Sequence, residues 1–348
     1  MGLPAVTLPA SERDWLTGLP KVELHCHLEG SMSVDTVRAL TERHGGDPTP
    51  VWPDGLPDVF SFDGFPSFAK QFWYGLSLLR SGEDLATATA DLAGTLARQN
   101  VRYAEITSTA YTHFRGHEGR PGMSWSEYRD GLDEGRREAA AIGVEIGWVI
   151  DIPRDLELPE ETVTIDYVES AVTPAGLVAI GLGGYEVGFP AAPYAAHFER
   201  AVAIGLHSVP HAGETEGPES VRQAVDALHA ERIGHGVRAI EDPALVERIA
   251  ERGIMLEVCP TSNVLLGVVE TIEAHALPAL RSAGVRVCLN TDDPGWFATD
   301  LVTELALASE HLGISRADHV AMQRDAVRAA FMSDSRRAAI TAELDAFV

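Results

Sequence analysis

A short stretch near the start of the chain, VELHCHLEG at residues 22–30, contains three residues that can bind a divalent metal ion. His25, His27 and Glu29 occupy alternate positions, and apolar residues fill the positions between them. Residues at i, i+2 and i+4 of a β-strand share one face. The three side chains are therefore expected to point in one direction, while the opposite face carries Leu24, Cys26 and Leu28.

Other apolar runs of the sequence end in residues of the same chemistry, namely His211 and Glu214 in HAGE, His235 in RIGHG, and Asp292 and Asp293 in NTDDP. A single histidine in an apolar run is more often a hydrogen-bonded core residue than a ligand. Burying so many polar groups together would be costly, and a bound metal removes that cost. Three imidazoles and a carboxylate form a ligand set that suits Zn²⁺, and a water in the remaining position makes such a site hydrolytic.

These residues need a frame that brings distant strand ends together. Strand-like runs alternate with helix-like segments, several of which open on a capping residue and close on glycine. The strand-like runs are residues 22–29, 101–109, 145–152, 177–184, 206–214, 232–237, 254–260 and 285–294. Such alternation predicts a parallel sheet. Eight strands in a chain of 348 residues predict an α/β fold of the (β/α)8 TIM-barrel type, whose active site lies at the carboxyl ends of the strands.

The chain is expected to form one metal-dependent hydrolase domain over residues 1–348. Two additions to a minimal barrel are predicted. A helical insertion over residues 46–98 follows the first strand–helix unit, and residues 299–348 add helices at the C-terminus. The insertion is the candidate for a lid over the active site.

The composition excludes several kinds of partner. The net charge is −25 with only 27 Lys and Arg, so neither nucleic acid nor a membrane surface is expected to bind. The N-terminus lacks the features of a secretory signal, and no apolar run approaches the roughly 18 residues that cross a membrane. The three cysteines are far apart in apolar runs and are expected to be reduced, as in a cytoplasmic protein.

The order of these motifs resembles that of the adenosine deaminase family of zinc aminohydrolases. The resemblance covers nearly the whole chain and rests on PKVELHCHLEG, GLGGYE, HAGETEG, ERIGHG, EVCPTSN and CLNTDDP. It implies a TIM barrel with one zinc ion per chain at its C-terminal mouth. It also implies hydrolytic deamination at C6 of an adenine-containing nucleoside, a small-molecule substrate.

Carried over position by position, the resemblance gives each motif residue a role. The zinc ligands would be His25, His27, His211 and Asp292. Glu214 would protonate N1 of the purine, and His235 would orient the attacking water next to Asp292. Glu214 can act in this way only if burial raises its pKa. On the substrate, Asp293 would contact N7 and the backbone N–H of Gly184 would reach N3.

Two departures from the pattern of adenosine-specific enzymes bear on the substrate. Those enzymes usually have Asp at the position of Glu29, near the ribose 5′-hydroxyl, and an acidic residue at that of Tyr185. Adenine deaminases share the glutamate but generally lack the Gly-Gly pair of GLGGYE. A third branch, with similar length and motifs, acts on 6-aminodeoxyfutalosine, an adenine nucleoside of menaquinone biosynthesis with a benzoate-bearing 5′ extension. This nucleoside is the expected substrate, with adenosine and then adenine as alternatives.

The extension requires contacts of its own. The insertion is rich in phenylalanine, and Phe62 and Phe65 are expected to contact the aryl group. A cationic partner for the benzoate is expected among Arg80, Arg115 and Arg154, and the sequence does not choose between them. Other polar residues are not assigned to the substrate: Glu186 and Glu257 are expected to support the site, and His113 and His117 are left out of it.

Two rival hypotheses predict different sequences. A two-metal amidohydrolase usually needs a carboxylated lysine or a glutamate at the fourth strand, but neither Lys21 nor Lys70 lies near that strand. A non-catalytic protein on the same fold predicts loss of the catalytic residues, which are all present here. Function is argued from the site rather than from the fold, so the single-metal aminohydrolase is favoured.

Overall fold

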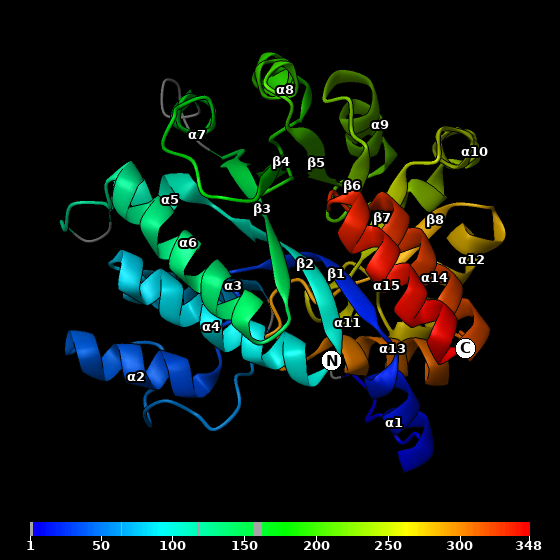
Figure 1. The fold of residues 1–348 in the computed structure, drawn as a ribbon, viewed down its shortest axis with the longest axis horizontal. Coiled ribbons are helices and arrows are strands. Elements are labelled where there is room, and N and C mark those ends of the chain that lie inside the picture. The colour runs from blue at the N-terminus through cyan, green and yellow to red at the C-terminus, as the bar shows by residue number, and fades with distance from the viewer. Residues whose placement is uncertain (1–2, 64, 117–118, 156–161) are drawn as a thin grey trace.

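Eight parallel strands form one sheet in the order of the sequence, which confirms the predicted (β/α)8 barrel (Figure 1). The computed structural model describes residues 3–63, 65–116, 119–155 and 162–348. The strands are β1 (Lys21–His27), β2 (Val101–Ser108), β3 (Glu145–Pro153), β4 (Leu177–Gly183), β5 (His207–Ala212), β6 (Arg232–His235), β7 (Met255–Val258) and β8 (Arg286–Leu289).

Helices surround the sheet, and further helices precede β1 and follow β8. Those in the first half are α1 (Ala10–Gly18), α2 (Val34–His44), α3 (Phe65–Leu78), α4 (Gly82–Arg98), α5 (Ala110–Arg115), α6 (Trp125–Ala141) and α7 (Thr162–Val168). Those in the second half are α8 (Ala195–Ala203), α9 (Pro218–Ala227), α10 (Pro243–Arg252), α11 (Pro260–Leu265), α12 (Leu277–Ser282), α13 (Leu301–His311), α14 (Arg316–Ala329) and α15 (Asp334–Phe347).

Local sequence explains where many of these helices begin and end. The side chains of Ser33, Ser124 and Asp300 each accept a hydrogen bond from a backbone N–H in the first turn of α2, α6 and α13. Such caps satisfy donors that have no partner within the helix. Gly45 and Gly253 end α2 and α10 in the left-handed conformation that glycine adopts readily.

The barrel closes between its first and last strands. The backbone N–H of His27 donates to the carbonyl oxygen of Asp292 at 2.8 Å, and the N–H of Asp292 donates to that of His25 at 3.0 Å. Asp292 also forms a bridge to Cys26. This closure places Asp292 directly beside the two histidines of β1.

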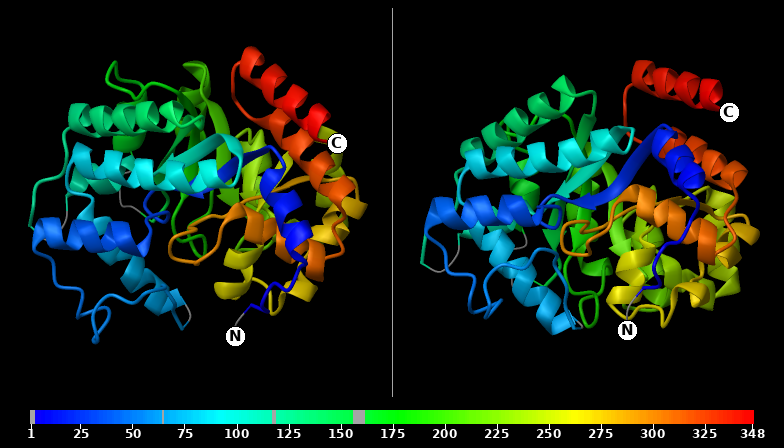
Figure 2. Two further views of the ribbon diagram at one scale, coloured as in Figure 1. Left: turned by 60° about the horizontal axis from the view of Figure 1, so that its bottom comes forward. Right: turned by 90° about the horizontal axis from the view of Figure 1, so that it is seen from below.

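The segment predicted as a helical insertion contains helices of two kinds. Helix α4 packs along α6, in the layer that surrounds the strands. Helices α2 and α3, in blue and light blue, lie at the outer edge on the side away from α14 and α15 (Figure 2). A lid role therefore suits α3 and the residues before it better than α4, and it stays a prediction.

The C-terminal helices were also expected. Helix α14 packs against β8 and β1, and α15 packs against α14. The two helices appear in red beside β7 and β8 in Figure 1. Among the described residues, no helix is both long enough and apolar enough to cross a bilayer.

The close crossing of α4 and α6 provides a test of this packing. A Cβ added at Gly82 would lie 2.6 Å from the carbonyl oxygen of Glu127, and one added at Gly131 would clash with the backbone of Gly82. Gly131→Ala should therefore lower the free energy of unfolding by about 1–3 kcal/mol, the usual cost of overpacking.

Gly94→Ala is the matched control for that variant. Gly94 also lies in α4, but a Cβ there would meet only the end of the Arg98 side chain at 3.5 Å. Alanine should leave stability unchanged or raise it by up to about 1 kcal/mol, its helix-propensity advantage. Denaturant unfolding of both variants measures the difference. Equal stabilities would contradict the packing of α4 on α6.

Candidate active site

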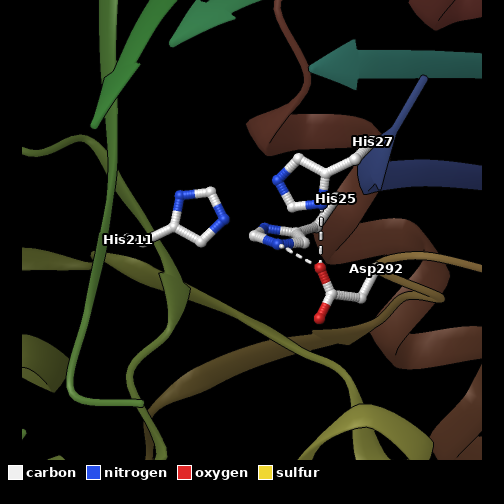
Figure 3. Close-up of side chains that lie close together, drawn as sticks. All are labelled: His25, His27, His211 and Asp292. Carbon is white, nitrogen blue, oxygen red and sulfur yellow. Dashed lines mark ion pairs between the residues drawn. The ribbon is translucent and has the colours of Figure 1, made fainter. Parts of the chain in front are cut away.

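Four side chains from three parts of the barrel converge at the carboxyl ends of the strands. His25 and His27 come from β1, His211 from β5, and Asp292 from the turn after β8 (Figure 3). One ligand atom from each lies within 4.8 Å of the others. These are the four residues that the sequence motifs proposed as metal ligands.

The donor atoms of this cluster suit a metal ion better than they suit one another. His25 Nε2 lies 3.4 Å from Asp292 Oδ1 and His27 Nδ1 lies 2.9 Å from it. Even so, neither nitrogen finds a hydrogen-bond partner of acceptable geometry among the described residues. Buried polar atoms without partners are rare, so a ligand that accepts several lone pairs is indicated. A divalent ion with nitrogen and oxygen ligands fits.

The charged groups around the cluster also favour a bound metal ion. Burial opposes the charged form of His25, but the nearby carboxylates of Asp292 and Glu257 outweigh it and raise the His25 pKa to about 10. The pKa of His211 is instead lowered by burial and by the neighbouring histidines, so its imidazole is neutral. The carboxylates of the cluster therefore attract positive charge, which a metal ion can supply in place of protons.

Two residues of the site have strained backbones. The φ angles of His235 and Asp292 are +61° and +64°. This left-handed region is uncommon for residues other than glycine and costs about 1–3 kcal/mol each. The strain aims both side chains into the mouth of the barrel, where His235 Nε2 lies 3.9 Å from Asp292 Oδ2.

The carboxylate of Glu186 holds in place the loop that carries Glu214. Glu186 accepts hydrogen bonds from the backbone N–H groups of residues 213–216, at 2.6–3.2 Å, and from the Ser220 hydroxyl. Glu214 itself lies 3.7 Å from His235 Nε2. Burial and the charge of Asp292 raise the Glu214 pKa to about 8, so this carboxyl group is protonated at neutral pH.

A chain of hydrogen bonds fixes the tautomer of His235. The backbone N–H of Leu277 donates to His275 Nδ1 at 3.0 Å, so the proton of His275 is on Nε2. That group contacts Asn263 Oδ1 at 3.1 Å, which leaves the Asn263 amide to donate to His235 Nδ1 at 3.3 Å. Burial lowers the pKa of His235 to about 4. His235 is therefore neutral and presents an N–H from Nε2 to Glu214 and Asp292.

Asp293 and Gly184 each follow the end of a barrel strand, β8 and β4 respectively. Asp293 is buried beside Gly30, where any Cβ would overlap its carboxylate. Burial and the charge of Asp292 raise the Asp293 pKa to about 7. Gly184 follows β4 with a φ of +86° and is exposed.

Glu29, two residues beyond the end of β1, has three polar partners at one carboxylate oxygen. Its Oε1 accepts hydrogen bonds from Ser108 Oγ at 2.7 Å and from the Thr109 N–H at 3.1 Å, and it lies 2.8 Å from His113 Nε2. Burial alone would raise the pKa of Glu29, but His113 outweighs it and the pKa is lowered. Glu29 is an ionised carboxylate at the carboxyl end of β2, and its partner His113 was not assigned to the site from the sequence.

Two more residues near the site were missed. Asp151 of β3 is buried 3.7 Å from His211 Nδ1, in the space that the absent side chains of Gly181 and Gly183 leave open. Burial raises its pKa to about 7. Arg232 of β6 forms a buried ion pair with Glu257, whose other oxygen lies 3.1 Å from His25 Nδ1. Each is a charged residue in an otherwise apolar strand, and that pattern in the sequence could have indicated a role near the site.

The residues proposed for the 5′ extension have different environments. Phe62 packs against Phe68 and against Phe297. Phe65 is the first residue of α3, and its side chain lies outside what the structure describes, as does His117. Arg154 is buried, and its guanidinium donates to the carbonyl oxygens of Leu182 and His211. Arg80 donates from Nε to the carbonyl oxygen of Ser77 at 3.0 Å.

Comparisons with known proteins agree with this geometry. The family model described as adenosine deaminase matches residues 20–347. An aminodeoxyfutalosine deaminase of Streptomyces avermitilis is 41% identical over 336 residues, which cover 96% of this chain and 92% of the relative.

Two solved structures are similar as well. Adenine deaminase of Arthrobacter aurescens matches with a TM-score of 0.87 and 28% identity, over 94% of this chain and 99% of that one. An amidohydrolase of Burkholderia ambifaria with bound Zn matches with a TM-score of 0.88 and 26% identity, over 99% and 97%.

Metal analysis of two variants tests which side chains hold the ion. Asp292 belongs both to the cluster with His25, His27 and His211 and to a second group with His235 and Cys259. Burial raises the pKa of Cys259 well above its usual value, so it is a thiol and a poor ligand. His211→Ala should lower zinc affinity by more than about tenfold, since even partners of ligands contribute that much.

Cys259→Ala is the control and should keep the metal content of the unmodified protein. Elemental analysis after dialysis against a weak chelator measures both variants. Loss of zinc from Cys259→Ala together with retention in His211→Ala would place the ion in the second group instead.

Proposed function

The chain belongs to the adenosine deaminase family, and we propose that it catalyses the zinc-dependent hydrolytic deamination at C6 of an adenine-containing nucleoside, releasing ammonia. Membership makes it a deaminase that hydrolyses carbon–nitrogen bonds. The observation that carries the proposal is the juxtaposition of a protonated Glu214 with the cluster of His25, His27, His211 and Asp292.

The four clustered residues would hold one zinc ion per chain. Zinc, when bound, would lower the pKa of a water molecule and so supply a nucleophile at neutral pH. His211 and the two histidines of β1 would bind the ion through neutral imidazoles, because the ion would replace the protons that the neighbouring carboxylates favour on His25 and His27. Asp292 provides the negative ligand, and its second oxygen stays 3.9 Å from His235 Nε2.

The reaction would use the proton positions described above. Protonated Glu214 donates to N1 of the purine, which makes C6 electrophilic. Water adds at C6, and the Nε2–H of His235 donates a hydrogen bond to the added oxygen. The carbon–nitrogen bond to the amino group then breaks. One proton of the water replaces that of Glu214 and the other leaves on ammonia, so the product has a 6-oxo group.

Two protein groups outside the cluster would bind the purine. Asp293 would contact N7 through Oδ1, which finds no hydrogen-bond partner among the described residues. The backbone N–H of Gly184 would donate to N3. These two contacts fix the base in its plane, which presents C6 to the water and N1 to Glu214.

Among adenine-containing substrates, we favour 6-aminodeoxyfutalosine, which would place the protein in menaquinone biosynthesis. The 41% identity to the aminodeoxyfutalosine deaminase of Streptomyces avermitilis supports this choice. Adenine is the second candidate, favoured by the similarity to the adenine deaminase of Arthrobacter aurescens. Adenosine is the third, because Glu29 stands where adenosine-specific enzymes usually have Asp.

Replacement of Glu214 tests the proton donor. Glu214→Gln keeps the shape of the side chain but removes the proton, so kcat should fall by about a hundredfold or more. In the unmodified protein, kcat/KM should decline as the pH rises through about 8, because Glu214 loses its proton above that pKa.

Glu216→Gln is the matched control in the same loop, and its activity should be close to that of the unmodified protein. Zinc content should be unchanged in both variants. Near-normal turnover by Glu214→Gln with zinc bound would contradict the assignment of Glu214 as the acid.

A substrate panel tests the choice of purine. We expect kcat/KM for 6-aminodeoxyfutalosine to exceed that for adenosine and for adenine by on the order of a hundredfold, because contacts to the extension contribute only to that substrate. Loss of absorbance near the adenine band measures each reaction. A large preference for adenosine or adenine would refute the choice.

A further inference from the structure

Asp151 of β3 has a buried carboxylate that the proposed reaction does not use. Its side chain is 1% exposed, and its Oδ1 finds no hydrogen-bond partner among the described residues. A carboxylate is costly to bury unless a nearby group offsets that cost. Buried polar atoms without a partner are rare, so the position of this carboxylate requires an explanation.

Two glycines of β4 allow this carboxylate to cross the neighbouring strand. Asp151 pairs with Gly181 in the register of β3 and β4. A Cβ added at Gly181 would lie 1.7 Å from Asp151 Oδ1, and one added at Gly183 would lie 2.4 Å from Oδ2. The carboxylate therefore fills space that side chains at both positions would occupy. Neighbouring strands are about 4.8 Å apart, so a short side chain of β3 can approach β5 only where β4 leaves this space open.

The carboxylate of Asp151 approaches His211 on β5. Its Oδ2 lies 3.7 Å from His211 Nδ1, which is also 3.1 Å from the carbonyl oxygen of Leu182. A carbonyl oxygen can only accept a hydrogen bond, so the proton of the His211 ring is on Nδ1. The other ring nitrogen, Nε2, is then left to bind a metal ion. Figure 3 shows one nitrogen of this ring turned toward the other residues of the cluster.

A second histidine of the cluster has a carboxylate in a similar place. Glu257 Oε2 lies 3.1 Å from His25 Nδ1. A carboxylate on the far side of a metal-binding imidazole orients the ring and makes it a stronger ligand. For His211 the direct partner is the carbonyl oxygen of Leu182. The contact of Asp151 is longer than a hydrogen bond, so it acts on the same N–H electrostatically.

We propose that Asp151 is a positioning residue of the metal site, which holds the Nδ1–H of His211 toward β4 and thereby raises the affinity of His211 Nε2 for the metal ion. It acts through His211 rather than on the substrate. The proposal rests on the proposed function, since the ion is the zinc of that reaction. Gly181 and Gly183 have a role as well, because a side chain at either position would displace the carboxylate.

Zinc affinity, measured by competition with a chromophoric chelator, tests this role without turnover. Asp151→Asn keeps the shape of the side chain but removes its charge, so zinc affinity should fall by about 10- to 100-fold. The visible spectrum of the Co²⁺-loaded variant should also change, because it depends on the ligands around the ion. Glu304→Gln is the matched control, since Glu304 is a buried carboxyl group whose partners are Thr261 and Thr299. Its zinc affinity should equal that of the unmodified protein.

A double-mutant cycle separates this role from a general effect on folding. The three atoms nearest to a Cβ added at Gly183 all belong to Asp151, with Oδ2 at 2.4 Å. Gly183→Ala should therefore push the carboxylate away from His211 and lower zinc affinity. In the Asp151→Ala background the same methyl group has room, so Gly183→Ala should cause no further loss. The melting temperature of each variant without metal reports on folding.

The possible results distinguish this proposal from the proposed function. Zinc affinity that stays unchanged in both Asp151→Asn and Gly183→Ala would overturn the proposal and leave the deaminase function standing. Equal losses from Gly183→Ala in the two backgrounds would also overturn it, because the effect of the methyl group would not pass through Asp151. If zinc affinity depends on Asp151 but no adenine-containing substrate is deaminated, the proposed function is wrong and the role of Asp151 stands.

Discussion

The candidate active site depends on the buried ion pairs of the Arg232 guanidinium group. It forms ion pairs with Glu257 and Glu105 inside the barrel, and it donates to the carbonyl oxygen of Ala329 at 2.8 Å. Glu257 in turn orients His25 through Nδ1. Removing one member of such a group would leave a buried charge without a partner, at a cost of about 3–5 kcal/mol.

This arrangement explains why helices at the far end of the chain matter to the site. Phe331, just after α14, lies under Arg232 with its ring centre 4.0 Å from the guanidinium carbon, and its backbone N–H donates to Glu105. The C-terminal segment thus closes the amino-terminal end of the barrel. At the other end, the closure of β1 against the turn after β8 holds His25 beside Asp292. One network of buried charges spans the barrel between the two ends.

Much of this could be predicted from the sequence, and the exceptions have physical causes. The alternation of His25 and His27 with apolar residues favours a strand, and eight strand-like runs that alternate with helices favour a barrel, so both could be predicted from local patterns. The contact between Glu29 and His113 could not be predicted in this way. The two residues lie 84 positions apart, and their contact depends on how α5 follows β2. Asp151 was also missed, because it occupies space left by glycines on the neighbouring strand.

We propose that three histidines and one aspartate form a single zinc site at the mouth of the barrel. Anomalous diffraction at the zinc edge, from crystals of protein purified without chelators, tests it most directly. We expect one peak, about 2.0–2.2 Å from a ligand atom of each of His25, His27, His211 and Asp292. Two peaks in the barrel, a peak bound by Cys259, or none within reach of these four residues would contradict it.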